Sequence, residues 1–445
     1  MITSPAWRGK RFAVLGLARS GAATVRALVA SEAEVLAWDS NEAARAQVWE
    51  QLKADRRDLG TEPGFQAKDW VAFPIDLSRF EAAVVSPGVP LNRHPVASKA
   101  AHYGVPLIGD IELFAQARAD LPAHRVVGIT GTNGKSTTTA LIHHIIETAG
   151  ISTRLGGNIG LPILGQEPLP AGGVYVLELS SYQIDLTRSL DCDVAVLLNI
   201  TPDHLDRYDG FEGYAAAKAR LFGMQTKGHA AIIGIGDAAS ANIARQVALS
   251  GRSEDVTRIA PGVCMDQSRW PALQGPHNAQ NALAAIAACE ALGIDRVAID
   301  RGLESFPGLP HRMERIATRN GVLFVNDSKA TNPESTAPAL SAFPRLHWIL
   351  GGVAKTDSLE ACRPGFGHVV RAYTIGEAGP LFAGLLEGEM PVEQCGTLEA
   401  AVRAAAANAQ PGDAVLLSPA CASFDQFRDF EARGDAFRAA VESLG

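Results

Sequence analysis

The sequence predicts an α/β protein of three domains, each built on a sheet of mainly parallel strands. Its 445 residues are enough for about three domains of roughly 150 residues each. Short apolar runs alternate with segments of helical periodicity along the whole chain, which is typical of parallel sheets flanked by helices. Many of these runs end in glycine, serine, asparagine or aspartate, as strands do where a sheet meets a ligand. We place the domains at residues 1–113, 114–308 and 309–445.

Composition and charge exclude several classes of protein. Hydrophobic residues make up 47% of the chain and charged residues 20%, so a disordered chain is excluded. A formal net charge of −8 argues against a protein that binds nucleic acid by bulk charge. No apolar run approaches the roughly 20 residues of a membrane helix, and the six cysteines include no CxxC pair. We expect a cytoplasmic monomer that binds small molecules and neither nucleic acid nor a membrane.

The first domain begins like a nucleotide-binding domain. A strand predicted at 12–15 leads into Gly16-Leu-Ala-Arg-Ser-Gly21, and further strands are predicted at 35–38 and 82–85. The glycine turn resembles the GxGxxG of a Rossmann-like domain, and Asp39 stands close to the position of its ribose-binding acid. Taken alone, this pattern favours an NAD-linked oxidoreductase. Alanine at the second glycine argues against that interpretation, because the backbone there must approach a pyrophosphate closely.

The strongest motif is a glycine-rich loop between a strand predicted at 125–129 and a helix predicted at 136–149. It reads Gly128-Ile-Thr-Gly-Thr-Asn-Gly-Lys-Ser136. Such loops turn backbone N–H groups toward phosphate oxygens at a helix N-terminus. Lys135 would reach the β- and γ-phosphates, and the Ser136 hydroxyl would bind Mg²⁺. The predicted ATP contacts in this P-loop are Gly131, Thr132, Asn133, Gly134, Lys135, Ser136 and Thr137.

The spacing of the glycines, at every third position, resembles the Mur ligases, the ATP-dependent amide-forming ligases of peptidoglycan synthesis. Folylpolyglutamate synthase belongs to the same superfamily and has a similar loop. Six further segments also resemble Mur ligase signatures and follow the family's order over most of the second and third domains. They are Gly156–Gly160, Glu178–Gln183, Asn199–Arg207, Ala217–Arg220, His277–Leu283 and Pro310–Glu314.

Other segments resemble the members of this family that add D-glutamate to UDP-N-acetylmuramoyl-L-alanine. They are Asn326–Asn332, Ser418–Phe427, Ser86–Pro90 and Gly109–Glu112. The Asp-Asn-Pro-Arg stretch of the members that add diaminopimelate or lysine is absent from the sequence. The resemblance implies an ADP-forming ligase that works through an acyl phosphate, with a central P-loop ATPase-type domain between two Rossmann-like domains.

This chemistry needs cations, because charge develops on phosphoryl oxygens while the acyl phosphate forms. A carboxylate at the end of a strand, Glu178, would bind one magnesium ion together with Ser136. The resemblance implies that His204 and a carbamylated Lys218 bind a second ion. From the residues alone, His204 could equally pack in a loop and Lys218 lie exposed on a helix. The catalytic residues that we predict are Lys135, Glu178, His204, Lys218 and Lys329.

The remaining site residues follow from the same resemblance. Asn281, Arg312 and Asp327 would bind ATP, and the forked guanidinium of Arg312 suits a phosphate. The incoming glutamate would contact Thr331, Lys355, Ser423, Phe424 and Phe430, although core packing is an alternative for the two phenylalanines. The UDP-sugar would contact Arg19, Ser20, Asp39, Ser86 and Asn158.

Several alternatives remain open. The nearest is a related ligase that adds L-glutamate, or one like folylpolyglutamate synthase. An NAD-linked oxidoreductase with a nucleotide-regulated domain is an alternative from a different class. A nucleotide switch without catalysis is disfavoured, because a switch has no need of the second metal site formed by His204 and Lys218.

Overall fold

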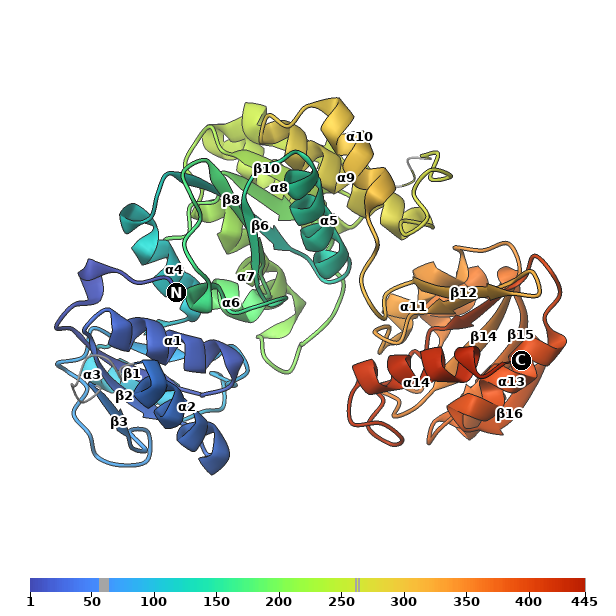
Figure 1. Cartoon of the computed structure of the whole chain (residues 1–445), viewed down its shortest axis with the longest axis horizontal. Helices are drawn as coiled ribbons and strands as arrows, with labels where there is room; N and C mark the ends of the chain where they lie inside the picture. Colours follow the sequence, from blue (N-terminus) through green and yellow to red (C-terminus); the bar gives the residue numbers. More distant parts are fainter. Residues whose placement is uncertain (56–63, 261, 263–264, 445) are drawn as a thin grey trace. The chain divides into compact units, whose positions relative to one another are not determined.

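The computed structural model describes residues 1–55, 64–260, 262 and 265–444. They form three sheets with helices packed against them, as Figure 1 shows, and this confirms the predicted α/β class. The chain divides into two compact units. Unit 1 comprises residues 1–261 and 283–302, and unit 2 comprises residues 262–282 and 303–445. No helix in the described part of the chain is both long enough and apolar enough to cross a membrane.

The first sheet of unit 1 has the order β3-β2-β1-β4-β5, and all its strands are parallel. The chain runs outward from β1 on one side and returns through β4 on the other. The strand order therefore reverses between β1 and β4. In open sheets, ligands bind at the carboxyl ends of the strands on either side of such a reversal. The elements are β1 (Arg11–Leu15), α1 (Arg19–Ala30), β2 (Glu34–Trp38), α2 (Glu42–Asp55), β3 (Phe65–Ala67), β4 (Ala82–Val85), α3 (Val96–Tyr103), β5 (Leu107–Ile108) and α4 (Asp110–Ala117).

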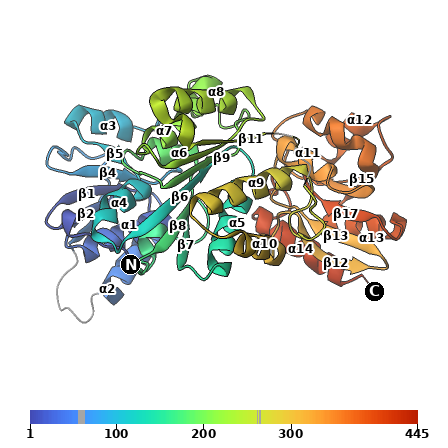
Figure 2. The ribbon, with the colours of Figure 1, turned by 90° about the horizontal axis from the view of Figure 1, so that it is seen from above.

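The second sheet of unit 1 has the order β11-β10-β9-β6-β8-β7 and is also entirely parallel. Helices α7 and α8 cover one face, and α5 lies on the opposite side, as Figure 2 shows. The elements are β6 (His124–Thr130), α5 (Lys135–Thr148), β7 (Thr153–Gly157), β8 (Gly173–Glu178), α6 (Ser181–Asp185), β9 (Val194–Leu197), α7 (Gly210–Gly223), β10 (Ala230–Gly234), α8 (Ala238–Val247) and β11 (Val256–Ile259).

Two helices continue the chain across the division between the units. Helix α9 (Pro276–Ala291) passes from unit 2 into unit 1 at residues 282 and 283. Helix α10 (Arg296–Ser305) passes back at residues 302 and 303. Unit 2 is therefore built from two separate stretches of sequence.

The sheet of unit 2 has the order β12-β13-β17-β14-β15-β16. Its strands are parallel except for β12, which pairs antiparallel with β13 at the edge. Buried side chains of α11 and α12 pack on one face, and those of α13 and α14 pack on the other. The elements are β12 (Glu314–Arg319), β13 (Val322–Asn326), α11 (Pro333–Leu340), β14 (Leu346–Gly351), β15 (Val369–Ile375), α12 (Gly379–Leu386), β16 (Val392–Gly396), α13 (Leu398–Asn408), β17 (Ala414–Leu417) and α14 (Phe430–Glu442).

Most predicted strands are found within one or two residues of their expected bounds. The apolar run at 194–200 predicts one strand over its whole length, but β9 ends at Leu197, and Asn199 bonds with the P-loop instead. The antiparallel edge strand β12 is not among the predicted elements. Helix α4 runs across residue 113, and the division into three domains stays a prediction.

Candidate active site

The P-loop lies between β6 and α5 and is held by the segment that follows β9. Gly131 and Gly134 take φ values of +151° and +86°, which side chains on L-residues disfavour. Asn199 accepts from the backbone N–H of Thr132 through its carbonyl (2.9 Å) and from that of Asn133 through its Oδ1 (2.9 Å). Its Nδ2 donates back to the Asn133 carbonyl at 3.0 Å. The loop is therefore fixed in place at the N-terminus of α5.

The predicted phosphate-binding lysine lies across this loop. Lys135 is the first residue of α5, and its Nζ donates to the carbonyls of Gly131 (2.9 Å) and Thr132 (2.8 Å). Ser136 follows it and is buried. The ammonium group thus lies at the mouth of a glycine loop and a helix N-terminus, where phosphates bind.

Glu178 ends β8 and lies next to the P-loop strand, since it pairs with Ile129 of β6. Its side chain is 2% exposed. Oε1 accepts a hydrogen bond from Asn158 Nδ2 at 3.0 Å, whereas Oε2 has no hydrogen-bond partner within the described structure. A buried carboxylate oxygen without a donor is costly unless a cation reaches it. Glu178 therefore fits the role of a magnesium ligand.

The donor set around the P-loop also fits magnesium. Mg²⁺ prefers hard oxygen ligands and completes its shell with substrate phosphates rather than with a cage of side chains. Glu178 and the hydroxyl of Ser136 are such oxygen donors. In the described part of the chain, no three side chains of histidine, cysteine, aspartate and glutamate form a metal site by themselves. A metal here would thus depend on nucleotide oxygens.

Lys218 also contacts the P-loop. It lies on α7 and is 1% exposed, so the alternative of an exposed helix lysine is wrong. Its Nζ donates to the Gly131 carbonyl at 2.9 Å and lies 4.6 Å from the centre of the Tyr214 ring. Burial and the charge of Lys135 hold the pKa of Lys218 well below its ordinary value. A buried lysine with a lowered pKa can act as a nucleophile.

His204 stands on the loop after β9, the strand on the other side of β6 from Glu178. Its backbone is left-handed, with φ of +53°. The ring centre lies 5.2 Å from that of Tyr182 and 6.5 Å from that of Tyr214, and Nε2 lies 3.5 Å from Asp203 Oδ2. Burial lowers the pKa of His204, which favours the neutral ring with a free lone pair.

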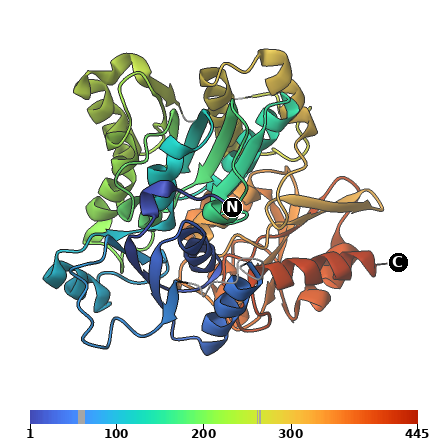
Figure 3. The same cartoon turned by 60° about the vertical axis from the view of Figure 1, so that its left-hand side comes forward.

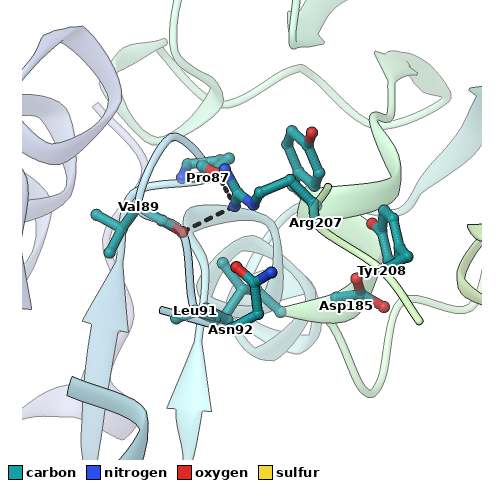
Figure 4. A pocket seen from close by; sticks show the side chains of 9 residues that line it. Pro87, Val89, Leu91, Asn92, Asp185, Arg207 and Tyr208 are labelled. Atoms are coloured by element: carbon teal, nitrogen blue, oxygen red, sulfur yellow. Dashed lines mark hydrogen bonds between the residues drawn. The ribbon is translucent and has the colours of Figure 1, made fainter. Parts of the chain in front are cut away.

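An arginine without a predicted role joins the loop of His204 to the first sheet. Arg207 donates through Nη2 to the carbonyls of Val89 (2.8 Å) and Pro87 (3.3 Å), as Figure 4 shows, and its guanidinium lies 4.1 Å from the Tyr182 ring. Asn92 Nδ2 also donates to the backbone carbonyl of Asp206, in the loop of His204, at 2.8 Å. These residues border a cavity of about 40 Å³. The sequence could have pointed to this residue, because Arg207 is the last residue of the segment Asn199–Arg207 that resembles a family signature.

The residues predicted to bind the UDP-sugar divide between the two sheets of unit 1. Asp39 follows β2, and its Oδ2 accepts from the backbone N–H of Leu17 at 2.7 Å. Ser86 follows β4, and its Oγ donates to the Gly16 carbonyl at 3.1 Å. Asn158 instead bonds to Glu178 in the second sheet, because β7 pairs with β8.

A buried acid lies beside two of these residues. Asp110, the first residue of α4, lines a small cavity together with Ser20 and Ser86. It is 5% exposed, and neither carboxylate oxygen has a hydrogen-bond partner within the described structure. Burial raises the pKa of Asp110 to about 6. Arg19, the first residue of α1, is exposed.

The three residues predicted to bind ATP in unit 2 are largely engaged by their neighbours. Asn281 is buried in α9 and donates to Asn278 Oδ1 at 3.1 Å. Asp327 follows β13 and accepts from Ser418 Oγ at 2.8 Å and from the backbone N–H of Met313 at 3.2 Å. Burial raises the pKa of Asp327 to about 7, while the charge of Arg312 opposes this shift.

Of the residues predicted to bind the amino acid, Thr331, Lys355, Ser423 and Phe424 lie on loops at the carboxyl edge of the unit 2 sheet, and Phe430 begins α14. Lys329 Nζ lies 3.9 Å from the centre of the Phe430 ring, and Lys355 Nζ donates to Thr331 Oγ1 at 3.3 Å. Phe424 is 73% exposed, so core packing is excluded for that residue. Ser423 is buried on the loop after β17.

Comparisons with known proteins identify the family of this chain. The Mur ligase middle domain matches residues 129–258, and the Mur ligase glutamate ligase domain matches residues 311–421. The UDP-N-acetylmuramoylalanine–D-glutamate ligase of Novosphingobium aromaticivorans is 62% identical over 446 residues, which cover 100% of this chain and 97% of that protein. The ligase of the same name from Sphingopyxis alaskensis is 61% identical over 450 residues, which cover 100% of each.

Solved structures share the fold. A UDP-N-acetylmuramate-alanine ligase from Thermotoga maritima aligns with a TM-score of 0.57 at 15% identity, over 98% of this chain and 100% of that one. The FolC protein of E. coli, in complex with DHPP and ADP, aligns with a TM-score of 0.54 at 20% identity, over 76% and 94%. The chain belongs to the Mur ligase family, in its group of UDP-N-acetylmuramoylalanine–D-glutamate ligases.

Proposed function

We propose that this chain joins D-glutamate to UDP-N-acetylmuramoyl-L-alanine in the cytoplasm, with conversion of ATP to ADP and phosphate. The observation that carries the proposal is the similarity, over the full length of the chain and at 61% and 62% identity, to two ligases named for this reaction. The buried Glu178 and Lys218 beside the P-loop supply groups that suit the chemistry.

The domains divide the substrates among them. A Rossmann-like domain of residues 1–113 binds the UDP-sugar, with Arg19, Ser20, Asp39 and Ser86 near its strand ends. A central P-loop domain of residues 114–308 binds the phosphates of ATP. A second Rossmann-like domain, residues 309–445, contributes Arg312 and Asp327 toward ATP and binds the incoming amino acid.

In the first step, a carboxylate oxygen of the alanyl group attacks the γ-phosphorus of ATP. The bond from this phosphorus to the β,γ-bridging oxygen breaks, and ADP leaves. Lys135 turns from its own loop carbonyls to the phosphate oxygens and follows the transferred group. Glu178 and Ser136 would hold magnesium, which when bound withdraws charge from the phosphoryl oxygens.

In the second step, the amine of D-glutamate attacks the acyl carbon of the acyl phosphate. The amine loses a proton, the carbon–oxygen bond to phosphate breaks, and inorganic phosphate leaves. Thr331, Lys355 and Ser423 orient the two carboxylates of the glutamate, and Lys329 acts near the acyl phosphate. These donors lie on loops of one sheet edge.

The Nζ of Lys218 attacks the carbon of CO₂ as the free amine and releases one proton to solvent. The carbamate that results, together with His204, would hold a second magnesium ion. The lowered pKa of Lys218 supports this, because the free amine is the form that attacks CO₂. The neutral ring of His204 likewise keeps a lone pair available. An anionic carbamate would also offset the positive charge of Lys135 nearby.

The test is phosphate release from ATP, Mg²⁺ and UDP-N-acetylmuramoyl-L-alanine, with D-glutamate, L-glutamate or no amino acid in parallel. We expect release only with D-glutamate. Release only with L-glutamate would keep the mechanism and overturn the substrate. Folded protein that binds ATP but releases no phosphate in any arm would contradict the proposal.

A further inference from the structure

A buried arginine joins three loops at the carboxyl edge of the unit 2 sheet. Arg433 lies on α14 and is 1% exposed. Its Nε donates to Ser328 Oγ at 3.0 Å, and Nη2 donates to the carbonyls of Ser328 (2.8 Å) and Cys421 (3.0 Å). Nη1 donates to the carbonyls of Ala422 (3.3 Å) and Gly351 (3.4 Å). One guanidinium therefore fixes the loops that follow β13, β14 and β17.

These loops carry the catalytic Lys329 and three of the residues that we assign to the incoming amino acid. Lys329 and Thr331 follow Ser328, Lys355 follows Gly351, and Ser423 follows Ala422. The strands β13, β17 and β14 are neighbours in the sheet, so their loops come together at one place. A movement of Arg433 would shift all of these residues relative to one another.

The loop after β14 is built to close around this guanidinium. Gly352 takes a φ of +130°, and a Cβ atom there would lie 2.2 Å from the Ala422 carbonyl oxygen and 3.2 Å from Arg433 Nη1. Val353 then pairs with Ala422 through two backbone hydrogen bonds of 2.9 and 3.0 Å. Only glycine at position 352 allows the backbone to approach so closely.

The charged guanidinium of Arg433 forms hydrogen bonds only to neutral groups. All five of its hydrogen bonds go to carbonyl or hydroxyl oxygens, and it forms no ion pair with any residue in the described ranges. Burial lowers the pKa of Arg433 to about 10, so the side chain remains charged at neutral pH. The carboxylate of Asp425 acts on it electrostatically, but Oδ2 of that residue accepts from the backbone N–H of Glu377. Burying a charge without a counter-ion is costly.

We propose that Arg433 is the positioning residue of the amino-acid site, and that its buried charge makes the site select an amino acid with an anionic side chain. This inference rests on the proposed function. The fork of the guanidinium sets the spacing of Lys329, Thr331, Lys355 and Ser423, and the side-chain carboxylate of the bound glutamate offsets its charge. Lysine cannot replace it, because one ammonium group cannot reach three loops.

The test compares Arg433→Lys and Arg433→Met with Arg438→Gln as the control. Arg438 lies on the same helix and pairs with Glu314, outside the proposed site. We expect the KM for D-glutamate to rise at least about tenfold in both Arg433 variants, while the KM values for ATP and the UDP-sugar stay within about twofold. Arg433→Lys should recover little, and the control should match the wild type. An unchanged KM for D-glutamate in folded protein, or equal losses in all three KM values, would overturn the inference.

A second measurement uses the wild-type protein, in case the variants do not fold. D-glutamine has the size of D-glutamate but carries no side-chain charge. We expect phosphate release with D-glutamine to have a kcat/KM at least about 100-fold lower than with D-glutamate. Similar values for the two would overturn the charge selection. Wild-type protein that is inactive with D-glutamate would instead refute the proposed function, so the two failures are distinguishable.

Discussion

Lys218 and Arg433 are both buried basic side chains at the carboxyl edge of a sheet, and both donate to backbone carbonyls. Lys218 makes one such bond, to Gly131, beside a second lysine. Arg433 makes five bonds that involve three loops. Burial moves the pKa of Lys218 well below its usual value, whereas Arg433, with a pKa of about 10, keeps its charge. The same burial thus yields a reactive amine from lysine and a fixed charge from arginine.

The largest effect should come from removing the reactive amine. We expect Lys218→Met to lower phosphate release at least about 100-fold, because the carbamate that we propose at this lysine could no longer form. Acetate should restore part of the activity by replacing the carbamate oxygens. Lys227→Met, at an exposed position, is the control. Full activity of Lys218→Met without acetate would remove this residue from the mechanism.

The next largest effect should come from a substitution in the loop after β14, which packs against the guanidinium of Arg433. We expect Gly352→Ala to lower the free energy of unfolding by roughly 2–3 kcal/mol, because its φ is strained and its Cβ would meet the Ala422 carbonyl oxygen at 2.2 Å. Gly367→Ala is the matched control, since a Cβ there meets nothing within 4 Å. Urea unfolding of both variants measures the difference. Equal stabilities would show that the loop around Arg433 is not tightly packed.

A third variant tests whether an arginine that donates to loop carbonyls has a smaller effect on substrate binding when it is less buried than Arg433. Arg207 also donates to loop carbonyls, but from a more exposed position. We expect Arg207→Gln to raise the KM for the UDP-sugar about fivefold, because the loop after β4 loses its link to the loop of His204. Arg258→Gln, at an exposed position of β11, should leave this KM unchanged. A loss as large as that of Lys218→Met would place Arg207 in the chemistry itself.

The smallest effect concerns Asp110, a buried acid whose side chain has no hydrogen-bond partner among the described residues. The pKa of Asp110 is raised from an ordinary 3.8 to about 6, so the folded state holds its proton more tightly than the unfolded chain. This acid therefore lowers the stability as pH rises from about 4 to about 6. We expect Asp110→Asn to melt roughly 2–4 °C above the wild type at pH 8, with the gain shrinking toward pH 4. A gain independent of pH would contradict the burial of an ionisable carboxyl.

Local sequence predicted the parts of the molecule that depend on local rules. The P-loop, the strand-end position of Glu178 and most strands follow from glycine spacing and apolar runs. Figure 3 shows the helices and strands from another side. The burial of Lys218 could not be predicted, because the carbonyl that it contacts lies 87 residues away. Arg433 was missed for the same reason, since its contacts with Ser328 span 105 residues. Asn158 lies with Glu178 because strand pairing, which periodicity does not encode, brings β7 beside β8.

The path of helix α9 has a consequence for how the protein unfolds. Its residues up to 282 belong to unit 2 and those from 283 onward belong to unit 1, although the helix is continuous. Helices are cooperative and gain most of their stability from packing. Loss of either unit would therefore remove the support of half of α9 and weaken the other half. Each unit comprises two separate stretches of sequence, so no single uninterrupted fragment of the chain corresponds to either unit alone.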